Sequence, residues 1–301
     1  MGLKILILNF CLRIVDICTF WIKPKPGTIT FISLTHNRLT SDFALIDEQL
    51  KKDGRWEIRY DLMVFRKNLW GDFLYFLNCL RQLVEIKRSQ LVILNDNNYV
   101  ISHMKPKSTK VLQVWHACGA VKRFGNQIRR KYTVSNYDAV LACSPVWQRV
   151  YSEAFGVQPA QVQVTGCPRL DTLLDAGAME KKARGLLEKY PQLKGKKILL
   201  YAPTFRGNIM DGMRPASFSA QAVVKDLPED WILVSRCHPL LRQTIEVDDR
   251  SVDLSGEDLY ALMHLSTAMV SDFSSVIFDY SLLQKPMISY VPDLEEYRNT
   301  I

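Results

Sequence analysis

The chain has 301 residues, enough for about two domains with separate hydrophobic cores at roughly 150 residues per domain. Its 48% hydrophobic content, its 14 Gly and 13 Pro, and the lack of any tract of one residue type exclude disordered, collagen-like and low-complexity chains. The net charge of +8 comes from one stretch, because eight Lys and Arg residues and no acidic residue lie between Asp96 and Asp138. Such a stretch favours phosphate groups, whether of a nucleotide, an anionic lipid or a nucleic acid.

The first 22 residues are strongly apolar, but three charged residues interrupt them and no small-residue cleavage site follows. They make a poor signal peptide and a poor membrane-spanning segment. In a helix, apolar residues at steps of three and four share one face, with Asn9, Arg13 and Asp16 opposite. These apolar residues are Leu3, Ile7, Phe10, Ile14, Ile17 and Trp21. The pattern fits a helix in a membrane interface and a helix packed on the protein's own core equally well.

From residue 28 onward, short β-rich runs alternate with helical stretches, which predicts parallel sheets with crossover helices. In the first half we expect strands at 28–34, 56–60, 91–95, 111–115, 139–142 and 162–165, and helices at 41–52, 70–85 and 145–154. In the second half we expect strands at 197–201, 231–235, 268–271 and 287–290, and helices at 180–190, 240–245, 258–265 and 274–283. The sequence therefore predicts an α/β fold with two Rossmann-like domains, over 27–175 and 176–301, after an apolar N-terminal segment over 1–26.

The seven cysteines are odd in number, lie far apart in the sequence and form no C-x-x-C pair. This pattern signals neither a disulfide framework nor a zinc site. We therefore expect no metal site and a reducing cytoplasm as the compartment.

Two histidines follow predicted strands at equivalent places in the two halves. Ligands of open parallel sheets bind at the carboxyl ends of the strands, so His116 and His238 are placed for acid/base chemistry. The alternative for each is a histidine that caps its strand through a backbone hydrogen bond. Gly119, Lys122 and Arg123 follow His116 closely, and the two cations suit an acceptor or phosphate site.

Two more motifs in the second half point to a phosphate site. Thr204 and Arg206 follow a predicted strand, and an arginine fork matches phosphate oxygens, although a surface arginine in a loop fits equally well. Asp272, Ser274 and Ser275 connect another strand to a helix start, where free N–H groups and two hydroxyls suit an anion. The alternative is plain N-capping by Ser274.

Several common site types are missing from the sequence. There is no P-loop, G-x-G-x-x-G fingerprint, G-x-S-x-G elbow or H-E-x-x-H helix, which removes most ATPase, dehydrogenase, esterase and metalloprotease interpretations. The remaining histidines, His36, His103 and His264, have weaker contexts. A structural role for His36 is favoured over a place in a ligand-binding cleft.

Five ordered motifs extend over roughly residues 111–298. They are Trp115-His116-x-x-Gly119 with Lys122 and Gly125, Thr165-Gly166-x-Pro168-Arg169-x-Asp171, Tyr201-Ala202-Pro203-Thr204-x-Arg206, Arg236-x-His238-Pro239, and Ser271-Asp272-x-Ser274-Ser275-x-x-x-Asp279-Tyr280, with Lys285-Pro286 and Asp293-Leu294-Glu295-Glu296-Tyr297 beyond them. This series resembles the CDP-glycerol glycerophosphotransferase family of teichoic acid synthesis. Ala117 and Cys118 depart from the Gly-Thr-Pro that members often carry, and relatives continue past Ile301, so the resemblance implies a truncated second domain.

The resemblance implies a GT-B-like architecture, with the donor nucleotide held by the second domain and the acceptor over the first. It implies a membrane-associated enzyme on the cytoplasmic face of the membrane, which moves glycerol phosphate or a related polyol phosphate from CDP-glycerol or CDP-ribitol to a lipid-linked teichoic acid or capsule acceptor and releases CMP. His116 and His238 are then the catalytic histidines, and Ser274 and Ser275 belong to the donor phosphate site. No cofactor is implied, and a role for a divalent cation stays open.

With the donor that this resemblance implies, our hypothesis is that an acceptor hydroxyl attacks the distal phosphorus of the CDP-polyol with His116 as base. The roles of His116 and His238 are interchangeable at this level. A glycosyltransferase of the same architecture with a nucleotide-sugar donor is the main alternative. A non-catalytic polyanion-binding protein is another, but the basic stretch lacks the aromatic-interleaved or zinc modules of nucleic-acid binders, so we expect no nucleic acid partner.

Overall fold

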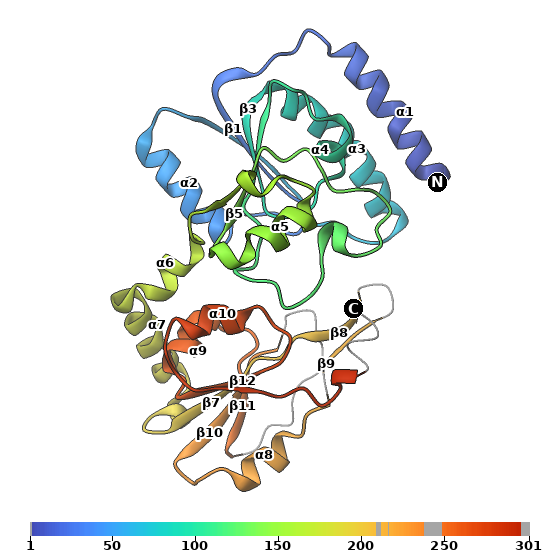
Figure 1. Ribbon diagram of the computed structural model, residues 1–301. Coiled ribbons are helices and arrows are strands. Elements are labelled where there is room, and N and C mark those ends of the chain that lie inside the picture. The colour runs from blue at the N-terminus through green and yellow to red at the C-terminus, as the bar shows by residue number, and fades with distance from the viewer. Residues whose placement is uncertain (1, 209–211, 216, 238–248, 296–301) are drawn as a thin grey trace. The chain divides into compact units, whose positions relative to one another are not determined.

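The computed structural model describes residues 2–208, 212–215, 217–237 and 249–295 (Figure 1). The chain forms two compact units: unit 1 contains residues 1–117 and 123–169, and unit 2 contains residues 118–122 and 170–301. The division falls at 169/170, whereas the sequence predicted a boundary at 175/176. The N-terminal segment 1–26 is part of unit 1, and the short segment 118–122 groups with unit 2.

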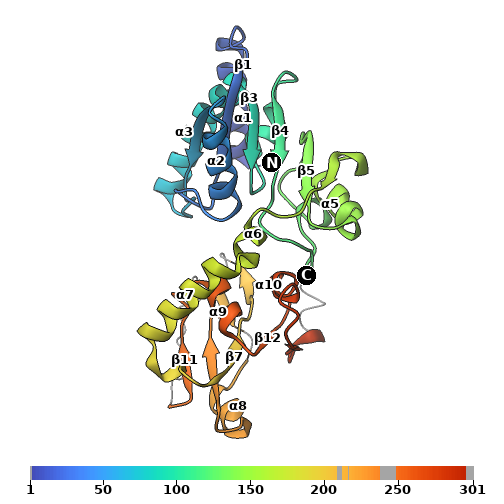
Figure 2. The same ribbon diagram turned by 90° about the vertical axis from the view of Figure 1, so that its left-hand side faces the viewer.

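Unit 1 is built on a six-stranded sheet in which every neighbouring pair of strands is parallel, in the order β2-β1-β3-β4-β5-β6. The strands are β1 (Lys25–Ser33), β2 (Glu57–Leu62), β3 (Ser89–Leu94), β4 (Lys110–Gln113), β5 (Ala139–Ala142) and β6 (Val162–Val164). Since all six run the same way, their carboxyl ends meet along one side of the sheet (Figure 2). We call the carboxyl ends of β1, β3 and β4 the unit 1 edge.

The helices of unit 1 are α1 (Leu3–Cys18), α2 (Asp42–Asp53), α3 (Leu69–Arg88), α4 (Tyr99–Met104) and α5 (Gln148–Phe155), with short 3-10 turns at Gly125–Gln127, Pro145–Trp147 and Pro159–Gln161. Local signals set their ends: the Asn68 side chain caps α3 by accepting from the Gly71 amide, and α2 stops at a left-handed Gly54. Phe43 of α2 packs on the strand residues Ile29 and Phe31. Burial of these apolar side chains fixes α2 against the sheet.

Helix α1 packs along α3 (Figure 1). Two of its polar residues, Asn9 and Asp16, bond to other parts of unit 1, while Arg13 is exposed. Asn9 accepts a hydrogen bond from the Tyr99 hydroxyl at 2.6 Å, and Asp16 pairs with the buried Lys87 ammonium at 2.5 Å. Leu8 and Leu12 are the residues of α1 that become buried. All the predicted face residues in the helix, including Phe10 (65% exposed) and Ile17 (70% exposed), stay largely exposed. The sequence was compatible with this apolar face packing on the protein's own core or lying in a membrane interface. In the structure the face points away from the core.

Unit 2 repeats the pattern with a parallel five-stranded sheet in the order β11-β10-β7-β12-β13. Its strands are β7 (Lys197–Tyr201), β10 (Trp231–Ser235), β11 (Ser251–Asp253), β12 (Ala268–Ser271) and β13 (Met287–Ser289), and its helices are α7 (Ala176–Lys189), α8 (Ala220–Asp226), α9 (Leu259–Leu265) and α10 (Val276–Ser281). Helix α6 (Arg169–Leu174) begins at the division, a 3-10 turn spans Pro191–Leu193, and a separate hairpin joins β8 (Phe205–Asn208) to β9 (Gly212–Pro215).

Two apolar clusters cover the faces of the unit 2 sheet. One joins α7, α9 and α10 to Leu200 and Val234, and the other joins α8 to Leu199 and Leu233. Neighbouring residues of one strand thus face different helices, as a strand buried on both faces requires. The fold class predicted from the sequence is therefore present in both units.

The expected strands of both units are present with small shifts at their ends. The sequence analysis missed five groups of short elements: α4, α6, α8, β11 and the β8–β9 hairpin. The helix expected at 240–245 lies outside the described residues.

Part of the last motif is used to hold unit 2 together. The Asp279 carboxylate accepts from the Tyr260 hydroxyl at 2.9 Å, and Tyr280 shares a buried hydrogen bond with Ser266. The Lys285 ammonium donates to three carbonyls at the end of α9, which is a C-cap. These residues fix α10 and β13 against α9, and α10 follows the carboxyl end of β12.

Candidate active site

At the unit 1 edge, His116 is held by the neighbouring strand end. Its Nδ1 lies 2.9 Å from the carbonyl oxygen of Asn95, which directly follows β3. A carbonyl only accepts, so Nδ1 carries the proton and Nε2 of the neutral ring carries the lone pair. The backbone hydrogen bond that the sequence analysis set against a catalytic role therefore leaves Nε2 available to accept a proton.

The backbone before His116 is strained. Trp115 has φ +62°, in the left-handed region that a bulky residue avoids. Its ring stacks on Phe124 at 4.9 Å and meets Phe155 edge-on at 5.1 Å, and its amide donates to the Gln113 side chain. These contacts hold Trp115 in this conformation, and strain held in this way is common at functional sites.

The charge state of His116 follows from its surroundings. The residue is exposed to solvent on one side, but burial of the ring by the surrounding protein lowers its pKa. The charges of Arg169 and His36 lower the pKa further, and the hydrogen bond to Asn95 opposes this shift. Neutral imidazole is therefore favoured near pH 7. A neutral ring with a free lone pair is the form that accepts a proton from a hydroxyl.

In unit 2, Arg206 is buried between two carboxylates. Its Nη1 lies 2.7 Å from Asp272 Oδ2, while its Nε and Nη2 donate to the two oxygens of Asp293 at 2.6 and 2.9 Å. Burial alone lowers the pKa of Arg206, but these two partners outweigh it and raise the pKa overall. The guanidinium expected to bind phosphate is therefore engaged by protein carboxylates, and both Arg206 and Asp272 act first as a buried ion pair (7% and 6% exposed).

Lys122 lies next to the Arg206–Asp272 ion pair in unit 2. Its Nζ is 3.2 Å from the Thr204 hydroxyl, and the Thr204 amide donates to Asp272 Oδ1 at 2.8 Å. Burial lowers the pKa of Lys122 to about 8, which Asp272 opposes and Arg206 reinforces. The structure thus brings together Thr204, Arg206, Asp272 and Lys122, four of the residues that the sequence analysis named.

Ser274 and Ser275 lead into α10, which has six residues. Ser275 occupies the N-cap position but makes no side-chain cap, and the Ser274 hydroxyl accepts only a long 3.5 Å bond from the Val276 amide. Capping therefore makes little use of these hydroxyls. Their assignment to a phosphate site stays a prediction.

His238 lies outside the described residues, so its part in the site stays a prediction. Its neighbour Arg236 is described, and the sequence analysis placed it in a motif without a role. The Arg236 Nη1 donates to the Cys237 carbonyl at 3.4 Å, and its buried Nε has no hydrogen-bond partner among the described residues. Burial lowers the pKa of Arg236. A partly buried guanidinium with an N–H that no described residue accepts indicates a ligand-binding role for Arg236, and the sequence alone could not show this burial.

The other predicted phosphate-binding residues are dispersed. Gly119 is buried in the segment 118–122, which groups with unit 2, whereas Arg123 is exposed and belongs to unit 1. Gly125 is required by packing: with φ +57°, an added Cβ would lie 2.1 Å from the Ala154 carbonyl oxygen. This close approach seats the turn after Phe124 against α5.

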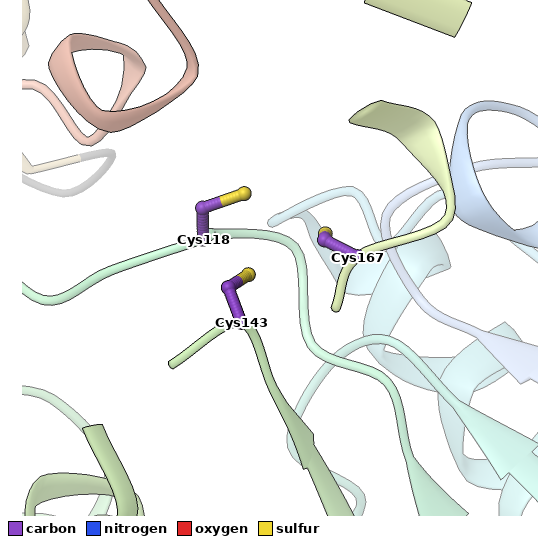
Figure 3. Close-up of side chains that lie close together, drawn as sticks. All are labelled: Cys118, Cys143 and Cys167. Carbon is purple, nitrogen blue, oxygen red and sulfur yellow. The ribbon is translucent and has the colours of Figure 1, made fainter. Parts of the chain in front are cut away.

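Figure 3 shows three cysteines that follow the ends of β4, β5 and β6. The sulfur atoms of Cys143 and Cys167, both in unit 1, lie within 4.8 Å of each other. The sequence distance between them hid this approach, because only the strand order β5-β6 makes them neighbours.

The comparisons with protein families and with known sequences agree on one family. Residues 17–300 match the CDP-glycerol:poly(glycerophosphate) glycerophosphotransferase family. The chain is 32% identical over 287 residues to a teichoic acid ribitol-phosphate primase of Bacillus spizizenii, covering 89% of this chain and 74% of that protein. It is 31% identical over 224 residues to a teichoic acid glycerol-phosphate primase of Bacillus subtilis, covering 69% of this chain and 57% of that protein.

A solved structure of the wall teichoic acid polymerase TagF has the same fold. It superimposes with a TM-score of 0.70 at 18% identity, covering 98% of this chain and 77% of that one. This match confirms the predicted GT-B-like architecture of two parallel sheets, and the sequence matches confirm the predicted resemblance. The chain belongs to the CDP-glycerol:poly(glycerophosphate) glycerophosphotransferase family.

Proposed function

We propose that this protein transfers a polyol phosphate from a CDP-activated donor to a lipid-linked teichoic acid acceptor and releases CMP. The observation that carries this proposal is the His116 ring, neutral and oriented by Asn95 so that Nε2 bears the lone pair. Family membership supports the reaction class. The relatives named above, a ribitol-phosphate primase and a glycerol-phosphate primase, support a teichoic acid acceptor.

The reaction begins when Nε2 of His116 takes the proton of an acceptor hydroxyl. The hydroxyl oxygen forms a bond to the distal phosphorus of the donor, and the bond from that phosphorus to the oxygen of CMP breaks. Phosphoryl transfer of this kind depends on positioning and on neutralisation of charge more than on covalent chemistry. His238 stays a candidate for a second acid/base or phosphate-binding role.

On the donor side, the charge that faces the diphosphate comes from groups other than Arg206. Lys122 supplies an ammonium next to Thr204, and the Nε of Arg236 has no hydrogen-bond partner in the part of the chain that the structure describes. Ser274 and Ser275 add hydroxyls that capping hardly uses. Arg206 instead fixes Asp272, which in turn accepts from the Thr204 amide.

The identity of the polyol is tested with a substrate panel. CMP release is measured with CDP-glycerol, CDP-ribitol and two UDP-sugars, and products are weighed by mass spectrometry. We expect turnover with at least one CDP-polyol and none with UDP-sugars. Sugar transfer without CMP release would favour the glycosyltransferase alternative and defeat this proposal.

We also propose that the protein works at the cytoplasmic face of the membrane as a peripheral protein. None of the helices in the described ranges has the length and apolar character to cross a bilayer. Helix α1 nevertheless directs its polar residues Asn9 and Asp16 at the protein and its apolar face at solvent. Exposed apolar residues of α3, against which α1 packs, add to this surface: Leu69, Trp70, Phe73, Leu74 and Leu77. An apolar surface of this size supports insertion into a membrane interface.

Vesicle co-sedimentation tests the membrane proposal. The wild-type protein should sediment with phosphatidylglycerol vesicles. The double variant Phe10→Glu with Ile17→Glu should bind them roughly tenfold more weakly or worse, because charged side chains replace apolar ones that would enter the membrane interface. Val146→Glu, at an exposed apolar residue elsewhere in unit 1 (72% exposed), is the matched control and should bind as the wild type does. Equal binding of the double variant would exclude α1 as the membrane surface.

A further inference from the structure

His36 has no part in the reaction described above, yet the fold places it beside the proposed base. Strand β3 lies between β1 and β4 in the sheet. His36 follows β1 and His116 follows β4, so the two histidines approach the end of β3 from opposite sides. Their separation in sequence gives no hint of this arrangement.

The His116 ring is bonded directly to the segment that follows β3, and the His36 ring is linked to that segment through the Thr35 hydroxyl. His36 Nδ1 lies 3.0 Å from the Thr35 hydroxyl, which is itself 3.5 Å from Asp96 Oδ2, and Asp96 Oδ2 also accepts from the Leu34 amide at 2.8 Å. On the other side, His116 Nδ1 donates to the carbonyl of Asn95. Asn95 and Asp96 are consecutive, so both anchors are adjacent positions of one backbone segment.

The charges around these rings favour an anion. Arg169 lies close enough for its charge to act on His116, as does His36. The nearby carboxylates are buried and already bonded: Asp96 accepts from Leu34, and Asp42 accepts from the Arg169 amide at 2.7 Å and pairs with its guanidinium at 3.2 Å. Solvent at this edge therefore meets the two imidazole rings and not the carboxylates, because both histidines are exposed and both acids are buried.

We propose that His36 and His116 together form an acceptor subsite in unit 1, in which His36 binds the phosphate group next to the attacking hydroxyl. This inference rests on the proposed function. A teichoic acid chain that ends in a polyol phosphate carries a phosphodiester beside its terminal hydroxyls. Strands two apart in a sheet are separated by about 9.5 Å, which leaves space for such a group between two side chains that lean over the strand between them. His36 then binds the anion while His116 takes the proton.

The same arrangement explains why cations surround a general base. Burial first, and then the charge of Arg169, lower the pKa of His116. Burial and Arg38 lower the pKa of His36, so the positive charges that attract the anionic acceptor are those of Arg169 and Arg38. A bound phosphate offsets those charges, so the base gains proton affinity when the acceptor is in place. His36 is thus a specificity-determining residue for a phosphate-bearing acceptor.

Steady-state kinetics on the full chain test the proposal. In His36→Ala, the KM for a phosphate-terminated acceptor should rise roughly tenfold, because one hydrogen bond to a charged group is lost. The KM for the CDP donor and kcat should each change less than about twofold. His36→Lys should restore much of the acceptor affinity. The control is His103→Ala, since His103 Nδ1 bonds to the Tyr99 carbonyl in α4. An unchanged acceptor KM in His36→Ala, or a raised donor KM, would overturn the inference.

A binding experiment keeps this test independent of turnover. With ¹⁵N-histidine-labelled protein, glycerol 3-phosphate should shift the side-chain signals of His36 and His116 but not that of His103, and glycerol at the same concentration should shift none. No response to glycerol 3-phosphate would also overturn the inference. A wild-type protein that responds in this way but releases no CMP from any CDP-polyol would instead defeat the proposed function.

Discussion

The two units repeat one architecture but treat charge at their carboxyl edges in opposite ways. Unit 1 presents an imidazole whose pKa is lowered and whose hydrogen bond goes to a neutral carbonyl. Unit 2 buries a guanidinium between Asp272 and Asp293, with its pKa raised overall. The comparison teaches that a conspicuous cation after a strand is not by itself a ligand site. Its partners decide whether it does chemistry or holds the fold.

The largest expected effect is on turnover, from the unit 1 edge. Replacement His116→Asn keeps an N–H that can donate to the Asn95 carbonyl but removes the base, so kcat should fall about 10²- to 10⁴-fold. CMP release measures this, and urea unfolding should show little loss of stability because the ring is exposed. Loss of stability with unchanged kcat would instead give His116 a structural role, like that of Arg206 in unit 2.

The next effect is on stability, from unit 2. Arg206→Met should lower the free energy of unfolding by about 3–5 kcal/mol, because it leaves two carboxylates at a buried position without their partner. Urea denaturation measures it. The triple variant with Asp272→Asn and Asp293→Asn should recover much of the loss. If Arg206→Met folds normally and only the donor KM rises, Arg206 binds phosphate as the sequence suggested.

A smaller effect concerns Lys122 and pH. Its pKa of about 8 means that the ammonium loses its proton as the pH rises through 8, so the donor KM should increase between pH 7 and 9. Lys122→Met should raise the donor KM roughly 10- to 100-fold at pH 7 and remove this dependence. Lys110→Met, at a surface lysine paired with Asp138, is the control and should keep the wild-type profile. A pH-independent donor KM in the wild type would remove Lys122 from the donor site.

The smallest effect is expected at the start of α10. Ser274→Ala or Ser275→Ala should each raise the donor KM by roughly two- to tenfold, the value of one neutral hydrogen bond. Thermal unfolding should change little, because neither hydroxyl makes a strong cap. A large loss of stability with unchanged donor KM would show that these serines only cap the helix.

Much of the fold was predictable because strands such as β3, β7, β10 and β12 contain short apolar runs that are mostly buried. The expected strand 139–142 coincides with β5, and 197–201 with β7. The short elements were missed where periodicity is too brief to register, as in the six residues of α4. The β8–β9 hairpin was missed because the residues after β7 were assigned to a proline turn and loop, whereas the structure pairs them as two short antiparallel strands.

The site was predictable only in part. The positions after β4 and β7 pointed correctly to places where polar groups gather, because parallel strands share a carboxyl edge. The bonding of Arg206 was not predictable, since Asp293 is 87 residues away in the chain. His36 was set aside as structural for the same reason: nothing local shows that β3 lies between β1 and β4.

By itself, the sequence determined the alternation of strands and helices, the family and the position of His116 after a buried strand, because these depend on local periodicity and on ordered motifs. Tertiary structure alone decided which cations are neutralised, which ring nitrogen of His116 carries the proton, and which way α1 faces. These properties depend on contacts between residues far apart in the chain, at distances of a few ångströms where hydrogen bonds and ion pairs act.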